Sequence, residues 1–166
     1  AKILEILGSN GSIALISDAG LPGINDPGEE LVHAAKLNSF EVICIPGPCA
    51  LINALISSGM PSSSFTFEGF LPKKNTERKQ ILLDISNQKK TTILFESPRR
   101  LKKLLQDLKN YCGGTREIQV SRELTKKFEE HIGKNIDDVI DFFEGKEVIG
   151  EITVVIKGIK KSKNLE

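Results

Sequence analysis

The densest set of ligand-binding residue types in the sequence is a loop rich in glycine and proline, DAGLPGINDPG, over residues 18–28. Three glycines allow a positive φ and a close approach of the backbone to a ligand, and two prolines stiffen the loop. We expect Asp26 to cap a following helix, with Pro27 at its first position. The loop is neither a Walker loop nor GxGxxG, so no phosphate cradle is indicated, and a plain strand–helix connection explains its composition equally well.

A second turn of this kind is Pro46-Gly47-Pro48-Cys49-Ala50, again between an apolar segment and a helical one. Its prolines hold the chain extended and its glycine admits a close neighbour. Cys49 has no histidine or basic residue nearby to stabilise a thiolate, so an inert thiol is favoured over a nucleophile. We expect no metal site, because the two histidines, His33 and His131, lack partners at ligand spacing.

Three carboxylates are candidate general bases. Glu96 and Glu123 each end an apolar, strand-like segment, and Asp18 opens the first loop. A carboxylate at such a position can accept a proton or a hydrogen bond from a ligand. The alternative for each one is a surface ion pair or a helix cap.

The net charge of +1 conceals two segments of opposite sign. Residues 72–109 contain eleven basic and four acidic side chains, whereas residues 128–151 contain eight acidic and two basic ones. A basic segment can bind the phosphates of an anionic polymer by releasing counterions, although solvated helix faces would give the same pattern.

Alternating apolar and amphipathic segments must position these residues. Periodicity predicts strands at 12–17, 41–45, 64–70, 91–95, 117–121 and 151–157, and helices at 28–38, 49–58, 76–87, 100–110 and 135–143. This alternation indicates an α/β fold with a parallel or mixed sheet. We expect a lobe boundary near Pro61, which gives a first lobe over 1–61, a second α/β lobe over 62–158 and a polar tail over 159–166. Three cysteines without paired spacing favour a reducing compartment, and the apolar runs are too short to span a membrane.

Six motifs appear in a fixed order: SDAGLPGINDPG, IPGPCALINAL, SSGMP, FEGFLPKK, FESPRRL and RELTKKFEE. Together they resemble the bacterial small-subunit ribosomal RNA methyltransferases that modify a cytidine 2′-oxygen, within the tetrapyrrole (corrin/porphyrin) methylase superfamily. The resemblance runs from about Ser12 to Lys157. It implies two α/β lobes, a homodimer, a cytoplasmic location and S-adenosyl-L-methionine held between the lobes.

The resemblance also assigns roles to residues. The cofactor-binding positions that it implies are Asp18, Ala19, Gly20, Pro22, Gly23, Asp26, Pro46, Gly47, Pro48, Cys49 and Ala50. The positions expected to grip 16S ribosomal RNA are Lys73, Lys74, Arg78, Arg99, Arg100, Arg122 and Lys126. With few aromatic residues and no tryptophan, contacts to the RNA backbone are favoured over base stacking.

Family members open with a strand, a GTPIGN-like loop and an acidic-Asp-Thr-Arg segment, none of which this sequence contains. The resemblance therefore predicts a truncated enzyme with the end of the first lobe and a complete second lobe. Two alternatives remain at this point: a methylase of a tetrapyrrole or another small molecule, and a non-catalytic RNA-binding fragment.

Overall fold

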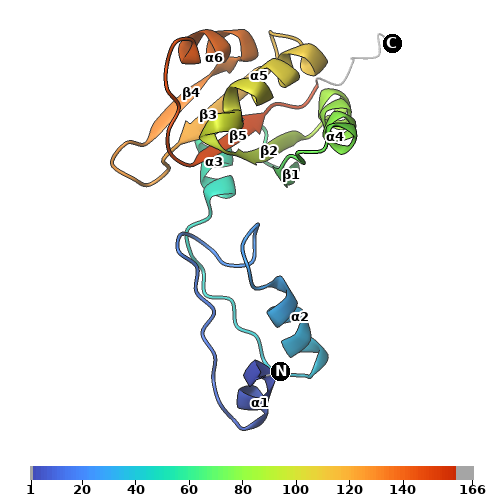
Figure 1. The fold of residues 1–166 in the computed structure, drawn as a ribbon, viewed down its shortest axis with the longest axis vertical. Coiled ribbons are helices and arrows are strands. Elements are labelled where there is room, and N and C mark those ends of the chain that lie inside the picture. The colour runs from blue at the N-terminus through green and yellow to red at the C-terminus, as the bar shows by residue number, and fades with distance from the viewer. Residues whose placement is uncertain (1, 160–166) are drawn as a thin grey trace. The chain divides into compact units, whose positions relative to one another are not determined.

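The computed structural model of the chain describes residues 2–159 and divides them into two compact units (Figure 1). The first unit ends at Cys49 and the second begins at Ala50. The polar tail expected over 159–166 lies, from residue 160 onward, outside the described residues. The sequence predicts a boundary near Pro61, whereas the structure assigns helix α3 (Ala50–Ser58) to the second unit, because α3 packs against strands of that unit's sheet.

The second unit is built on one five-stranded mixed sheet. Its strands are β1 (Phe65–Phe70), β2 (Thr91–Glu96), β3 (Glu117–Arg122), β4 (Glu130–Asn135) and β5 (Ile152–Ile156). Their spatial order is β1-β2-β5-β3-β4, in which only β1 and β2 are parallel. The mixed α/β sheet expected from the alternating pattern is confirmed.

Three helices pack on one face of this sheet: α4 (Asn75–Asn87), α5 (Pro98–Cys112) and α6 (Ile136–Phe143). The apolar stripe of α5 is fully buried, with Leu104 and Leu108 both at 0% exposure. It meets the inward side chains of the central strands, such as Val120 and Val154. Residues at i, i+3, i+4 and i+7 lie on one side of a helix, so this stripe supplies the unit's core.

The opposite face of the sheet is covered in part by α3. Leu51, Ala54 and Leu55 are the buried residues of α3, and the helix contacts β5 and β2. Ile93 and Val155, which are paired across β2 and β5, are also fully buried but point away from the α5 side. Both faces of the central strands are therefore apolar, which explains why these strands have continuous apolar sequences.

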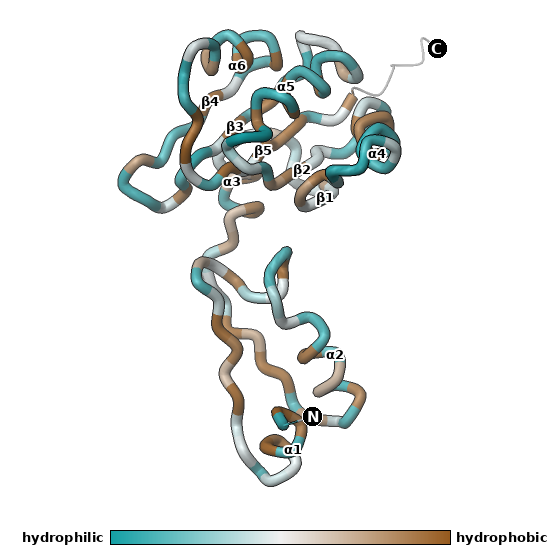
Figure 2. The backbone as a smooth tube through the Cα atoms, in the orientation of Figure 1, coloured by the Kyte–Doolittle hydropathy of each residue, from teal (hydrophilic) through white to brown (hydrophobic). Residues whose placement is uncertain are grey.

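The first unit contains helices α1 (Lys2–Gly8) and α2 (Glu29–Leu37) but no described strand. The strands expected at 12–17 and 41–45 are wrong for this structure, since both segments are extended without strand pairing. Figure 2 shows hydrophobic stretches along both segments, and Ile16 is 84% and Ile43 70% exposed. An apolar segment becomes a strand only where a neighbouring strand takes up its N–H and C=O groups, and none within residues 2–159 does so.

Two elements were not expected from the sequence, α1 and β4. Strand β4 has a single apolar inward residue, Ile132, and lies at the edge of the sheet, where only β3 pairs with it. A polar edge strand has no alternation strong enough to detect. The remaining helices and strands of the second unit agree with the expected ranges to within two residues.

Candidate functional site

The two glycine–proline loops of the first unit meet through their backbones. A Cβ atom added to Gly20 would lie 3.2 Å from the carbonyl oxygen of Pro48, and one on Gly47 would lie 3.6 Å from Leu21 Cδ1. Gly20 and Gly23 have φ values of +79° and +83°, which side chains disfavour. The structure thus brings together the two loops that the sequence marked as candidates for ligand binding, and Gly20 is the position at their contact where both φ and the close approach favour glycine.

The start of α2 differs from the expectation that Asp26 caps it with Pro27 at the first helical position. The structure places the N-cap at Gly28, with φ +137° and no side-chain cap. A Cβ on Gly28 would collide with the Leu15 side chain, so the close approach of residue 15 sets this turn. Asp26 is therefore not the N-cap of α2, and its carboxylate forms no hydrogen bond with the described residues.

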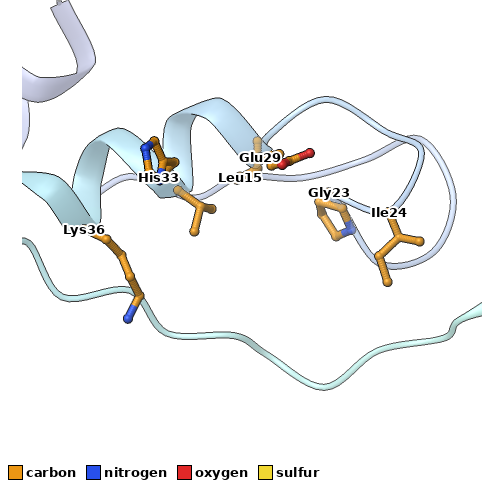
Figure 3. Close-up of a pocket in the computed structure, with 8 residues that line it drawn as sticks. Leu15, Gly23, Ile24, Glu29, His33 and Lys36 are labelled. Atoms are coloured by element: carbon orange, nitrogen blue, oxygen red, sulfur yellow. The ribbon is translucent and has the colours of Figure 1, made fainter.

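A pocket of about 440 Å³ lies beside the first loop, within the first unit. In Figure 3, Gly23 and Ile24 lie on the loop side and Glu29, His33 and Lys36 extend from α2. The wall contributed by residues 15, 22 and 24 is apolar, while the helix contributes a carboxylate, an imidazole and an ammonium group. Such a combination suits a small ligand that carries both an apolar part and groups of either charge.

Ten of the residues expected to bind a cofactor belong to these two loops of the first unit, and Ala50 begins α3 in the second unit. Asp18, Ala19, Gly20, Pro46, Gly47 and Pro48 are exposed, and Pro22, Gly23, Asp26 and Cys49 are half-buried. Within residues 2–159 the Asp18 carboxylate forms no side-chain hydrogen bond or ion pair, although it borders a tight turn in which the Ser17 hydroxyl donates to the Ala19 carbonyl at 3.2 Å. Asp18 is therefore free to accept a proton or a hydrogen bond from a ligand.

Glu96 occupies a different environment at the end of β2. Its side chain is fully buried, Oε1 accepts from the backbone N–H of Ser97 at 2.8 Å, and Oε1 lies 3.4 Å from Arg100 Nε. Arg100 in turn donates to the carbonyl of Leu71 at 2.6 Å. The second oxygen, Oε2, is buried without a partner among the described residues. Through Ser97 and Arg100, this carboxylate connects the start of α5 to Leu71, the residue that follows β1. Its contacts are therefore structural.

Glu123 lies at the end of β3 in a network of charges. Its Oε1 accepts from the backbone N–H of Glu151 at 2.8 Å and from Lys126 Nζ at 3.1 Å, and Lys126 also pairs with the Glu151 carboxylate. The hydrogen bond from Glu151, followed by the one from Lys126, lowers the pKa of Glu123 below its usual value of 4.5. A carboxylate stabilised in this way is a weak base, and its geometry favours fixing the β3–β4 loop.

A polar chain that the sequence did not reveal runs across the second face of the sheet. Glu129 Oε1 lies 2.8 Å from His131 Nε2, and His131 Nδ1 lies 3.0 Å from the Ser121 hydroxyl. The side-chain amide of Gln119 donates to Ser121 at 3.1 Å and to Ser57 of α3 at 3.2 Å. Ser121 is fully buried, so the chain joins elements and does not present a nucleophile. It depends on the pairing of Ser121 with His131, which no local pattern encodes.

Most of the cations expected to bind RNA are engaged within the protein. Arg78 is buried and pairs with Asp107 at 2.8 Å, and Arg122 pairs with Glu130 while donating to the Ile149 carbonyl. Lys74, Arg100 and Lys126 also have acidic partners. Lys73 and Arg99 are exposed and form no ion pair with the described residues. Five of the seven cations expected to bind RNA are therefore paired with acidic side chains, which leaves Lys73 and Arg99 available.

No three metal-binding side chains gather anywhere in the part of the chain that the structure describes. Across the same residues, none of the helices combines the length and hydropathy needed to cross a membrane. The three cysteines form no disulfide; Cys44 is exposed, and burial raises the pKa of the Cys112 thiol above its usual value of 9.0.

Comparison with solved structures identifies the fold. The methyltransferase CobJ matches with a TM-score of 0.69 at 16% identity, covering 95% of this chain and 69% of that one. Cobalt precorrin-4 methyltransferase, CbiF, matches with a TM-score of 0.66 at 15% identity, covering 94% of this chain and 68% of that chain. At these identities the likeness concerns the fold.

Sequence relatives are much closer. Proteins named "Ribosomal RNA small subunit methyltransferase I" from Synechocystis sp. and Vibrio cholerae are 45% and 43% identical over 95% of this chain, which spans 56% of their length. The protein of that name from Thermotoga maritima is 40% identical, and the chain covers 70% of it. The family model for tetrapyrrole (corrin/porphyrin) methylases matches residues 1–140. The chain therefore belongs to the tetrapyrrole methylase family, with the relatives named ribosomal RNA small subunit methyltransferase I.

Proposed function

We propose that this chain acts in the S-adenosyl-L-methionine-dependent 2′-O-methylation of a cytidine ribose in small-subunit ribosomal RNA. The observation that carries the proposal is the identity of 40–45% over about 95% of the chain to relatives named for that RNA. The chain spans about 56% of the length of the first two relatives. That it carries the activity of a full-length relative is therefore itself part of the proposal. The contact between the two glycine–proline loops is consistent with it.

The first unit has features that fit the cofactor. Gly20 and Gly47 allow the two loops to approach each other closely, and residues 46–48 are exposed, so that their backbone carbonyls are candidates to face a sulfonium or to accept from an adenine amine. A structural relative, uroporphyrin-III C-methyltransferase from Thermus thermophilus, was solved in complex with S-adenosylhomocysteine. In our proposal Asp18, Gly20, Gly47 and Pro48 hold the cofactor, which supplies an activated methyl group when bound.

The proposed general base is Asp18. A ribose hydroxyl is a poor nucleophile, and a carboxylate within hydrogen-bonding reach raises its reactivity by taking up the proton. Of the three candidates, Asp18 is exposed and without a partner in the described part of the chain, whereas Glu96 is shielded and Glu123 already accepts two hydrogen bonds. Glu96 and Glu123 then act as positioning residues for α5 and for the β3–β4 loop.

The proposed RNA contacts begin with Lys73 and Arg99, which precede α4 and open α5. Both are exposed cations that can meet phosphates without first breaking an ion pair. A homodimer, as the family resemblance implies, and a cytoplasmic location, where ribosomal RNA is made and modified in bacteria, complete the proposal. Light scattering of the purified chain tests the dimer.

The decisive experiment supplies small ribosomal subunits, or uroporphyrinogen, together with cofactor labelled in its methyl group. We expect label in the RNA, at a position that resists alkaline cleavage because its 2′-oxygen is blocked. Transfer to uroporphyrinogen instead would establish a small-molecule methylase. Calorimetry with S-adenosyl-L-methionine gives the second readout: RNA binding without any cofactor binding would identify a non-catalytic RNA-binding protein.

A further inference from the structure

The loop between β3 and β4 presents an aromatic ring to solvent. Phe128 is 66% exposed, and within residues 2–159 it belongs neither to the buried core nor to any aromatic pair. The next most exposed phenylalanine, Phe70, is 50% exposed and packs on Phe95 with ring centroids 5.7 Å apart. A single exposed apolar side chain is ordinary by itself. Phe128 is distinguished by the loop that holds it and by the cation beside it.

The loop that carries this ring is fixed from both sides. Glu123 and Thr125 have positive φ values of 54° and 66°, which cost free energy unless surrounding contacts impose them. On one side Lys126 bridges the carboxylates of Glu123 and Glu151. On the other, Glu129 Oε2 accepts from the Thr125 N–H at 2.6 Å, while its Oε1 meets His131. Figure 1 shows the β3–β4 loop extending beyond the sheet, so a pre-ordered loop displays Phe128 there.

The charges around the ring distinguish one neighbouring lysine from the rest. Lys126 is held by Glu123 and Glu151, whereas Lys127 forms no ion pair with a described residue and lies with its Nζ 5.5 Å from the Phe128 ring centroid. The remaining loop carboxylates are paired with Lys126, Arg122 or His131. One flat ring beside one available cation matches a nucleotide, whose base can stack while its phosphate meets the ammonium group.

We propose that Phe128 stacks on an unpaired base of the RNA substrate, with Lys127 at the adjacent phosphate. The proposal rests on the ribosomal RNA function proposed above and deepens it, because a stacking ring requires a single-stranded or splayed-out nucleotide. A protein partner fits less well, because a single ring bordered by charged side chains offers little of the apolar area that a stable protein interface buries. The composition had favoured backbone contacts over stacking, and this ring is an exception.

The chain contains no tryptophan, so Phe128→Trp introduces a unique fluorophore at the contact. The probes are a single-stranded RNA of about ten nucleotides with mixed sequence and its fully paired duplex. We expect the single strand to quench the fluorescence of the introduced indole and the duplex to quench it little. Leu83→Trp, at a 47% exposed position on α4, is the matched control and should not respond.

Affinity variants separate stacking from general apolarity. Phe128→Ala should weaken single-strand binding about tenfold without changing its salt slope, since one stacked base contributes roughly a factor of ten. Phe128→Leu should behave like alanine, because leucine keeps apolar bulk without a π-face. Lys127→Ala should reduce the salt slope by about one ion.

Three results would overturn the proposal: full rescue by leucine, equal quenching at position 83, or a Phe128→Ala variant that changes oligomeric state and leaves RNA affinity intact. The last result would assign the ring to a protein interface. The wild-type chain distinguishes this failure from failure of the proposed function. If it binds and methylates ribosomal RNA while Phe128→Ala does so equally well, only the stacking proposal fails; if it methylates a tetrapyrrole and binds no RNA, the proposed function fails with it.

Discussion

The Pro48 carbonyl oxygen lies 3.2 Å from the point where a Cβ atom on Gly20 would stand, so the two loops of the first unit touch backbone to backbone. Neither loop contains a helix or strand that would fix its conformation. Their mutual position depends instead on glycine conformations and on prolines that limit φ.

Gly20→Ala is therefore expected to disturb the proposed cofactor site. The new methyl group crowds Pro48 and forces a side chain to φ +79°, at a cost of about 1–3 kcal/mol in local strain. We expect cofactor affinity, measured by calorimetry, to fall about tenfold or more. Gly59→Ala is the matched control, because Gly59 also has a positive φ but no neighbour within 4 Å. Equal losses in both variants would contradict a role for the loop contact.

Asp18→Asn preserves the size of the side chain and removes its capacity to take up a proton. If Asp18 is the base, methyl transfer to RNA at saturating cofactor should fall by about 100-fold or more, and the saturating concentration separates this loss from any loss of cofactor affinity. Asp84→Asn changes the same functional group at an exposed position of α4, outside the proposed site, and should leave the rate nearly unaltered. A normal rate in Asp18→Asn would show that Asp18 is not the general base.

Lys73→Ala combined with Arg99→Ala should weaken RNA binding and reduce the salt slope by about two ions, because each free cation releases counterions when it meets a phosphate. Lys109→Ala serves as the control from the same basic segment, since Lys109 pairs with Asp137 at 2.8 Å. Filter binding at several salt concentrations measures all of these slopes. An unchanged slope in the double variant would show that these two cations do not touch RNA.

Asp107→Ala leaves the Arg78 guanidinium buried without its partner. Arg78 is 4% exposed, and its Nε donates to Asp107 Oδ2 at 2.9 Å. An uncompensated buried charge is costly, so the free energy of unfolding in urea should fall by about 3 kcal/mol. Asp84→Ala on the exposed side of α4 should change it by less than about 0.5 kcal/mol. If the two variants are equally stable, the buried pair does not join α4 to α5.

The β3–β4 loop should loosen in acid. Backbone hydrogen bonds from Glu151 to Glu123 and from Thr125 to Glu129 are the leading causes that lower the pKa values of these carboxylates below 4.5. A lowered pKa in the folded state means that the stabilisation is complete above pH 4.5 and is lost as the pH falls through the lowered values. The amide resonances of Thr125 and Glu151 should therefore move below pH 4.5, and Glu123→Gln should abolish only the response of Glu151. Midpoints above 4.5 would contradict this ordering.

The second unit was largely predictable because its signals are local. The leucine stripe of α5 predicts a helix with one buried side, and the continuous apolar run of β5 predicts a strand buried on both faces. Neither prediction depends on knowing the neighbouring elements. The first unit was not predictable in the same way, because an apolar segment such as 41–45 indicates only that a strand is possible. Whether a strand forms depends on a neighbour that the segment itself does not specify.

The candidate site divides in the same way. The special backbone conformations of Gly20 and Gly23 could be predicted from composition, since a turn rich in glycine and proline is typical of residues with positive φ. The environments of Arg78 and Glu96 could not be predicted from the sequence, because both depend on tertiary packing. Packing brings Asp107 of α5 to Arg78, and it buries Glu96. Charge counting along the chain cannot distinguish an ion-paired cation from a free one.

The strand order has a consequence for how the second unit is made. Strands β2 and β3 never pair with each other, because β5 lies between them and hydrogen-bonds to both. In a growing polypeptide, residues 152–156 leave the ribosome after everything else that they join. Without these residues the sheet is a β1–β2 pair and a β3–β4 hairpin with open inner edges, so the last strand of the sheet is the one that joins its two halves.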